Sequence, residues 1–293
     1  MPPESPAPLE IPAAGGSLHA VRFGGGPRTA LAAHGITGQG MSFAAVARHL
    51  PEDWSLVALD LRGRGASADL GGPYGLARHA EDVQRAAEHL GAGGEVTLTG
   101  HSMGAYVALM AAAGRPDLFD RVLLVDGGLP LPVPADFDPD AVLEATLGPA
   151  IARLAMTFPD IDAYVDFFRA HPSFGTYWNA DLEAYVRADA TGPAGAVRAR
   201  AREEAVRTDG RDLLTATDTL ARDLHRLDVP TLLLYAPRNL MDAEPGLQPA
   251  GVVAHWADEA PALRTELIPD VNHYTVLLGA GAEHVAARLT GDW

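Results

Sequence analysis

The stretch from Glu95 to Tyr106, EVTLTGHSMGAY, constrains this chain more than any other part of the sequence. Its first residues alternate between polar and apolar side chains, which is typical of a short strand. Ser102 follows, with Gly100 and Gly104 two residues away on either side, and a run of small apolar residues at 105–113 predicts a helix. A strand, a G-x-S-x-G turn and a helix together predict a nucleophile elbow.

The glycines of this turn have a steric reason. A turn this tight strains the serine backbone and brings neighbouring backbone so close that side chains at the two glycine positions would clash. In return, the hydroxyl group of Ser102 stands clear at the carboxyl edge of a sheet, and the N–H of Met103 points at the reacting centre. The sequence therefore predicts Ser102 as a nucleophile and Met103 N–H as one donor to an oxyanion.

Strands and helices alternate along most of the chain. Apolar strands are predicted at 28–33, 54–61, 121–125, 231–235 and 263–268, an edge strand at 17–23, and helices at 41–50, 76–90, 250–260 and 280–289. Strands that are apolar throughout and alternate with helices indicate an α/β fold, in which a mostly parallel central sheet carries helices on both faces.

The alternation stops at a proline-spaced segment, 129–134. Beyond it the sequence has helical patterns alone, at 141–158, 161–170, 182–190, 196–208 and 211–224. We therefore predict a helical cap at 130–227, inserted after the sixth strand of the sheet. Residues 17–129 and 228–293 are predicted to form the core domain, and 1–16 a loose N-terminal leader. About half of the aromatic residues lie in the cap, where they are expected either to pack its own core or to line a pocket.

Composition excludes several classes of function. The 22 basic residues are all arginine, and a net charge of −16 argues against a nucleic-acid partner or an anionic membrane surface. The absence of cysteine excludes disulfides and a thiolate nucleophile. No secretory signal and no apolar run of about 20 residues is present. We expect a cytoplasmic protein with no cofactor and no metal, whose oligomeric state stays open.

A serine hydroxyl is a weak nucleophile and needs a base that a third group holds in place. His273 follows the last predicted strand, where a loop can fold back over Ser102, and is predicted to be that base. His101, beside the serine, is expected to pack under the elbow. His171, in the predicted cap, is a candidate for contact with substrate.

Two aspartates compete for the third position. Asp126 ends the strand at 121–125 directly and is followed by two glycines, which places its carboxylate one strand away from the elbow. After the next strand, Asn239 stands where a carboxylate is expected, and Asp242 is available if the loop bulges. A neutral asparagine cannot stabilise an imidazolium ion, so one of the two aspartates must supply the charge. Asp126 is favoured, and Asp242 is the alternative.

Other polar residues also fall at predicted strand ends. The segment H-G-I-T-G follows the strand at 28–33, where Gly35 lets the backbone approach and Ile36 N–H is predicted to be the second oxyanion donor. Asp60 and Arg62 are expected to hold loops through an ion pair, with a role in substrate binding as the alternative. The predicted substrate contacts are Gly35, Tyr106 and Trp178.

Four motifs in this order resemble the α/β-hydrolase superfamily with a helical cap: His34-Gly35, DLRGRG at 60–65, GHSMG at 100–104 and Asn272-His273. An acid directly after the sixth strand is similar to the haloalkane dehalogenase and zearalenone-lactonase branches. Dehalogenases and epoxide hydrolases carry an aspartate nucleophile, however, whereas this chain has Ser102. The resemblance therefore implies a cap-bearing serine hydrolase that cleaves an ester or lactone of a bulky apolar substrate through an acyl-enzyme.

Other activities stay open beside this one. A C–C bond hydrolase or a perhydrolase would use the same three side chains, and a non-catalytic ligand receptor could keep the same fold. The sequence contains neither the phosphate-binding motif G-x-x-x-x-G-K-[ST] nor the zinc-binding motif H-E-x-x-H, which gives no support to a nucleotide hydrolase or a zinc protease.

Overall fold

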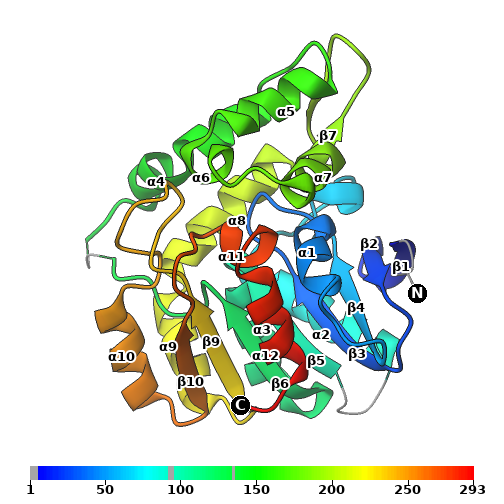
Figure 1. Ribbon diagram of the computed structural model, residues 1–293. Coiled ribbons are helices and arrows are strands. Elements are labelled where there is room, and N and C mark those ends of the chain that lie inside the picture. The colour runs from blue at the N-terminus through cyan, green and yellow to red at the C-terminus, as the bar shows by residue number, and fades with distance from the viewer. Residues whose placement is uncertain (1–5, 92–95, 134–135) are drawn as a thin grey trace.

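The computed structural model of the protein describes residues 6–91, 96–133 and 136–293 (Figure 1). The first residue of the elbow stretch, Glu95, and the start of the predicted leader, 1–5, lie outside the described residues. So do 134–135, at the end of the proline-spaced segment. The described chain forms a central sheet with helices on both faces and a helical region beyond the carboxyl ends of the parallel strands.

The sheet has eight strands in the order β1-β2-β4-β3-β5-β6-β9-β10. Along the chain these strands are β1 (Ala7–Ala13), β2 (Gly16–Phe23), β3 (Arg28–Ala33), β4 (Trp54–Leu59), β5 (Val96–His101), β6 (Phe119–Val125), β9 (Thr231–Tyr235) and β10 (Leu263–Leu267). All pairs from β4 to β10 are parallel, whereas β1 and β2 join antiparallel. The carboxyl ends of the parallel strands therefore share one edge, where ligands of such sheets bind.

Each face of the sheet has its own apolar layer. Successive side chains of a strand point to opposite faces, so Leu31 and Ala33 of β3 pack in one layer and Ala30 and Ala32 in the other. The first layer contains α2 (Leu76–Leu90), α3 (Met103–Gly114), α9 (Thr217–Arg226) and α10 (Ala250–Glu259), and the second contains α1 (Ala44–Ala47), α11 (Thr275–Leu278) and α12 (Ala282–Thr290). The predicted α/β architecture is confirmed.

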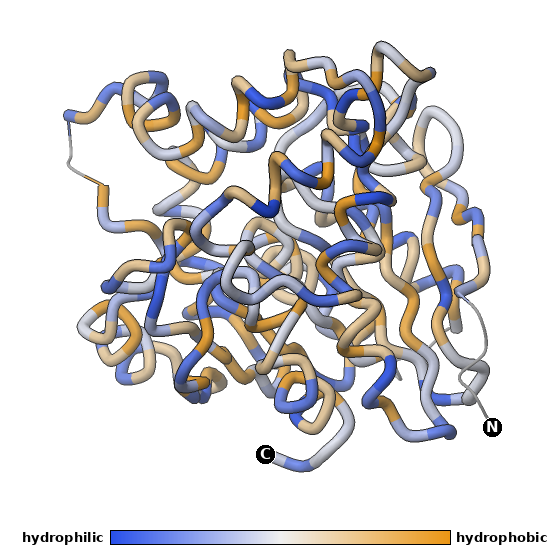
Figure 2. The backbone as a smooth tube through the Cα atoms, turned by 45° about the horizontal axis from the view of Figure 1, so that its top comes forward, coloured by the Kyte–Doolittle hydropathy of each residue, from blue (hydrophilic) through white to orange (hydrophobic). Residues whose placement is uncertain are grey.

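The covering helices are amphipathic. In α2 the buried residues Leu76, Ala80, Val83 and Ala87 recur at helical spacing and form one stripe against the sheet. Hydrophobic and hydrophilic residues alternate along the helices in Figure 2, as expected where one side is buried and the other faces solvent. Among the described helices, none combines the length and the apolar character needed to cross a bilayer.

A helical region is inserted between β6 and β9, as predicted. It comprises α4 (Pro139–Leu154), α5 (Ile161–Arg169), α6 (Pro172–Gly175), α7 (Ala180–Asp189), the hairpin of β7 (Ala190–Thr191) and β8 (Arg198–Ala199), and α8 (Glu203–Thr215). In Figure 1, α4 to α7 lie beyond the carboxyl ends of the strands. Helix α9 belongs to the predicted cap by sequence, yet its Leu220 and Leu224 pack in the same layer as α3 of the core.

Three predicted helices differ from the structure. The helix expected at 211–224 is divided at Ala216, because α8 ends at Thr215 and α9 begins at Thr217. The helix expected at 196–208 begins at Glu203, because the preceding residues form the hairpin β7–β8. Gly192 and Gly195 adopt φ values of +103° and +85° in the turn of this hairpin, a backbone conformation that favours glycine. The helix expected at 41–50 is a 3-10 turn, Gly40–Phe43, followed by the single turn of α1.

The prediction of a loose leader is wrong for the residues that the structure describes. Strand β1 pairs with β2 along its whole length and buries Ile11 completely. Strand β2 is consequently an inner strand and not the predicted edge strand. Pro8 and Pro12 hid this strand from the sequence pattern. An edge strand tolerates proline because its outward N–H groups need no partner strand.

Candidate active site

Ser102 occupies the turn between β5 and α3 with φ 54° and ψ −123°. This region is strained for a residue other than glycine. The neighbouring strand holds the turn, since Ser102 N–H donates to the carbonyl of Val125 at 2.9 Å. Strain at this residue was predicted from the sequence, and the structure places its side chain at the carboxyl edge of the sheet, in the wall of a cavity.

Both glycines of the turn are sterically required. A Cβ atom on Gly100 would overlap the carbonyl oxygen of Gly104, and one on Gly104 would overlap the carbonyl oxygen of Ala33 in β3. Backbone atoms cannot rotate out of the way as the end of a side chain can. Gly127, next to Asp126, is restricted in the same way by the carbonyl of Ser102. Close backbone approach therefore explains these glycines.

Asp126 and His273 are hydrogen-bonded in the structure. Asp126 Oδ2 lies 2.6 Å from His273 Nδ1, and both side chains are buried. The second oxygen of Asp126 accepts the N–H of Ala236 at 3.0 Å, which fixes the carboxylate plane. Asp126 itself has φ 47°, in the turn that ends β6. The carboxylate is thereby aimed at the imidazole from one strand beyond the elbow.

The alternative acid, Asp242, contacts residues of the cap and of neighbouring loops. Its Oδ2 accepts the hydroxyl of Tyr177 at 3.0 Å, its Oδ1 accepts Asn272 Nδ2 at 3.0 Å, and Arg238 forms an ion pair with it. Among the described residues its partners do not include His273. Asp242 thus ties the loop after β9 to the cap and to the loop before His273.

Two further histidines lie close to the elbow. The ring of His101 is 4.6 Å from that of His273, and its Nε2–H donates to the His273 carbonyl at 2.8 Å. Burial, reinforced by the nearby His273, lowers the pKa of His101 well below its usual value. His34 accepts the N–H of Leu61 at Nε2 and donates from Nδ1 to Gly35, and burial lowers its pKa to about 3. Both rings are therefore neutral supports.

The loop after β3 approaches the serine closely. A Cβ on Gly35 would lie 3.2 Å from Ser102 Cβ, so this position cannot take a side chain without moving the serine. The next residue, Ile36, lines the cavity together with Met103. Arg64, fully buried, donates from Nε to the Ile36 carbonyl at 2.9 Å and holds this peptide in place.

Ser102 and His273 line one cavity of about 450 Å³, within the range of ordinary small-molecule sites. The predicted contacts Gly35 and Tyr106 are also in its wall. Sequence reasoning missed most of the other lining residues, which come from α4, α7, α8, the loop after β9 and the start of α11: Leu143, Leu147, Tyr185, Leu213, Leu214, Leu247, Gln248, Tyr274 and Leu277. His171 lies in the wall, half-buried, where burial lowers its pKa.

Trp178 does not line this cavity, so the prediction of a substrate contact there is not met. The guanidinium of Arg169 lies over its indole ring at 5.0 Å, on the outer part of the cap. Most other cap aromatics form one network of edge-to-face contacts, among them Phe158, Tyr164, Phe167, Phe168 and Phe174. The cap uses its aromatic residues mainly for its own core, and Tyr185 is an exception.

The DLRGRG segment holds loops, as expected, although its ion pair has a different partner. Asp60 accepts the N–H groups of Gly40 and Ala66, each at 2.7 Å. Arg62 pairs through two nitrogens, each at 3.0 Å, with Asp82 of α2, and both side chains are buried. Neither Asp60 nor Arg62 lines the cavity at Ser102.

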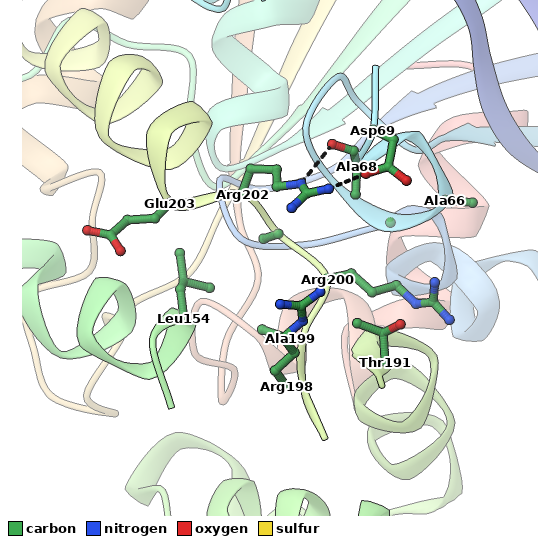
Figure 3. A pocket seen from close by; sticks show the side chains of 12 residues that line it. Ala66, Ala68, Asp69, Leu154, Thr191, Arg198, Ala199, Arg200, Arg202 and Glu203 are labelled. Atoms are coloured by element: carbon green, nitrogen blue, oxygen red, sulfur yellow. Dashed lines mark hydrogen bonds and ion pairs between the residues drawn. The ribbon is translucent and has the colours of Figure 1, made fainter. Parts of the chain in front are cut away.

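A second, smaller cavity of about 260 Å³ lies where β8 and the start of α8 meet the segment 65–69 (Figure 3). Arg198, Arg200 and Arg202 line it, and Arg202 is paired with Asp69. It contains none of the predicted catalytic residues. Within the described ranges, no group of three or more histidine or acidic side chains is placed to hold a metal ion.

Comparison with known proteins identifies the family of this chain. The family model described as alpha/beta hydrolase fold matches residues 31–280. Lipase LipV of Mycobacterium tuberculosis is 35% identical over 115 residues, which are 39% of this chain and 43% of that protein. N-formylmaleamate deformylase of Pseudomonas putida is 36% identical over 140 residues, 44% of this chain and 51% of that protein. The matches thus span about half the length of these relatives or less.

Among solved structures, E-2-(acetamidomethylene)succinate hydrolase superimposes with a TM-score of 0.79 at 21% identity, over 97% of this chain and 98% of that one. At this identity the likeness shows the shared fold. The family model shows more, because it matches the sequence itself over a range that includes the elbow, both neighbouring loops and His273. The protein therefore belongs to the α/β-hydrolase fold family.

Proposed function

We propose that this protein is a serine hydrolase that cleaves neutral carboxylic esters with a bulky apolar group. The observation that carries the proposal is the buried pair of Asp126 and His273, at 2.6 Å, in the wall of the cavity that also contains the strained Ser102. A structural role alone would not require a positive-φ serine, a buried imidazole and a buried carboxylate at one edge of the sheet.

The proposed reaction begins with acylation. Because Asp126 engages Nδ1, His273 keeps Nε2 free to accept the proton of Ser102 Oγ as that oxygen attacks the ester carbonyl. The N–H groups of Ile36 and Met103 stabilise the resulting oxyanion. Collapse of the tetrahedral intermediate breaks the C–O bond, and the imidazolium returns its proton to the departing alkoxide, so that a neutral alcohol leaves.

Deacylation repeats these steps with water. His273 takes a proton from water, the hydroxide adds to the acyl carbonyl, and the oxyanion is again held by the two N–H groups. The bond to Ser102 Oγ then breaks and the serine recovers its proton from the imidazolium. Asp126 stays ionised throughout and stabilises the positive charge on His273.

The lining supports a neutral, apolar substrate. Leucines from several elements dominate the wall, and among the described residues no arginine faces this cavity. The chain contains no lysine, so a carboxylate on the substrate would meet neither a lysine nor an arginine in this wall. The names of the deformylase and of the succinate hydrolase specify acidic substrates. LipV, in contrast, is named a lipase, and an apolar cavity of this kind favours the ester cleavage that this name implies.

Open-chain esters are the substrates that we propose. None of the three proteins compared above has a lactonase name, so the lactone part of the sequence-based expectation has no support from them. Macrolactones belong in a substrate panel as a secondary class.

Labelling with a fluorophosphonate probe tests the nucleophile. The folded protein should be labelled at Ser102, and Ser102→Ala should abolish the signal. In parallel, p-nitrophenyl esters of increasing acyl length should be hydrolysed, whereas the same esters with a terminal carboxylate should react at least about tenfold more slowly, because an unpaired buried charge is costly. Ser173→Ala is a matched control, since Ser173 is a buried cap serine whose hydroxyl donates to Leu240.

Absence of labelling in folded protein, together with tight binding of an uncleaved ester, would support a ligand receptor and contradict the proposal. Hydrolysis with a preference for the terminal carboxylate would keep the reaction and overturn the substrate class.

A further inference from the structure

One polar pair lies in the otherwise leucine-rich wall of the cavity. Gln248, in the loop between β9 and α10, is 3% exposed. Its Nε2 donates to the hydroxyl oxygen of Tyr106 at 3.2 Å. Both side chains line the cavity that contains Ser102. Tyr106 is one of the substrate contacts predicted from the sequence, whereas no local pattern marks Gln248.

The pair has hydrogen-bonding capacity to spare. Gln248 Oε1 accepts no hydrogen bond from the residues that the structure describes. Since Nε2 donates to the phenol oxygen, the Tyr106 O–H is left as a donor. Burial raises the pKa of Tyr106, so the hydroxyl group keeps its proton. The pair therefore presents one acceptor and one donor side by side.

The amide oxygen of Gln248 reaches the open space of the cavity, since it is not among the buried polar atoms that lack a partner. A ligand that fills this space removes water from both polar atoms, and a buried polar atom without a partner is costly. A ligand group that bonds to both atoms should therefore bind better than an apolar group of the same size.

The position of Tyr106 on the helix after the elbow indicates how far such a group lies from the reacting carbonyl. Tyr106 follows Ser102 by four residues in α3, which corresponds to a rise of roughly 6 Å along the helix. A substituent about five or six bonds beyond the ester carbonyl would span this distance.

We propose that Gln248 and Tyr106 form a polar subsite, which selects esters with a neutral hydroxyl group about one helical turn from the reacting carbonyl. A hydroxyl group both donates and accepts, and so satisfies Oε1 and the phenol at once. A carboxylate accepts only and would be repelled by Oε1. The inference rests on the proposed function, because it concerns the substrate of the same cavity.

The test compares two substrates, p-nitrophenyl hexanoate and the same ester with a hydroxyl group at the far end of the acyl chain. The wild-type protein should favour the hydroxylated ester by about tenfold in kcat/KM. Gln248→Met keeps the length of the side chain and removes the amide, and Tyr106→Phe removes the hydroxyl alone. Each variant should reduce the ratio of the two kcat/KM values to about one.

Thr146→Val is the matched control. Thr146 lines the same cavity, but its hydroxyl donates to the Val142 carbonyl within its own helix at 2.8 Å. This variant should keep the tenfold ratio, whatever it does to the absolute rates.

The outcomes separate the inference from the proposed function. If the wild-type protein hydrolyses both esters equally, or if both pair variants keep the ratio, the subsite is refuted and ester hydrolysis still stands. If neither ester is hydrolysed, the proposed function fails. The subsite is then measured by calorimetry, as the affinities of the corresponding ethyl esters for Ser102→Ala and for Ser102→Ala combined with Gln248→Met. Equal affinities for the two esters in Ser102→Ala would overturn it.

Discussion

The edge of the sheet and the inserted cap contribute to the cavity in different ways. At the edge, Ser102 and Asp126 follow strands directly and are held by backbone atoms of neighbouring segments. Ile36, three residues beyond β3, is held by the buried Arg64. In the cap, most aromatic side chains pack against one another, and the cavity receives mainly leucines and Tyr185. Reactive groups thus come from the rigid layer, and the cap supplies shape and apolar surface.

The largest expected effect concerns the acid at the sheet edge. Asp126→Asn should lower kcat by about a thousandfold or more, because the amide cannot stabilise the imidazolium and favours the wrong tautomer of His273. Asp242→Asn, in the loop that ties to the cap, should change kcat by less than about threefold and the unfolding free energy by about 1 kcal/mol. Steady-state kinetics on a simple aryl ester measure both. A reversed order of the two variants would overturn the assignment of the acid.

The next effect is on stability at the elbow. Gly104→Ala should lower the free energy of unfolding by about 3 kcal/mol, since the new Cβ would overlap the Ala33 carbonyl and force the backbone to move. Gly251→Ala is the matched control. Gly251 lies in α10 with open space around its Cβ position, so alanine there should stabilise the protein by about 0.5 kcal/mol. Urea unfolding measures the free energy of unfolding of both variants. Equal values for Gly104→Ala and Gly251→Ala would contradict the close approach of the Ala33 carbonyl to Gly104.

Acid should weaken the sheet edge through its buried histidines. The folded-state pKa of His34 is about 3, against 6.5 in the unfolded chain. Between pH 3 and pH 6.5, the His34 imidazole is protonated in the unfolded chain but stays neutral in the folded protein. The free energy of unfolding should therefore fall by up to about 1.4 kcal/mol per pH unit as pH drops from 6.5 toward 3.

His34→Gln should have a smaller slope than the wild-type protein in this window and run parallel to it above pH 7. Urea midpoints measured across the pH range test this expectation. Identical slopes for the two proteins below pH 6.5 would show that His34 does not stay neutral in the fold.

The smallest effects concern two cap aromatics. Trp178→Leu should change kcat/KM by less than about twofold, because the indole lies against Arg169 and outside the cavity. Tyr185→Leu, at the cavity wall, should raise KM by roughly fivefold, equivalent to about 1 kcal/mol of lost contact with substrate. If Trp178→Leu and Tyr185→Leu changed KM equally, the cap would have to bring Trp178 against the substrate, in an arrangement that differs from this structure.

Much of the site was predictable because it follows local rules. The glycines around Ser102, the apolar strands and the placement of Asp126 directly after β6 are properties of short segments. His273, the oxyanion loop and the inserted cap followed from their places after or between predicted strands, and the resemblance to a known family then agreed with them. Strand β1 was missed because its prolines break the alternating pattern, and proline is tolerated there only because the strand lies at an edge.

The sequence by itself determined the fold class and the serine at the elbow, because strand periodicity and a turn that demands glycine are written in neighbouring residues. Only the tertiary structure decided which aspartate meets His273, since Asp126 and Asp242 are both close to strand ends and differ in where their carboxylates point. It also decided that Trp178 packs on the cap while Gln248 enters the cavity. Those choices depend on how distant segments pack, and no local pattern records that packing.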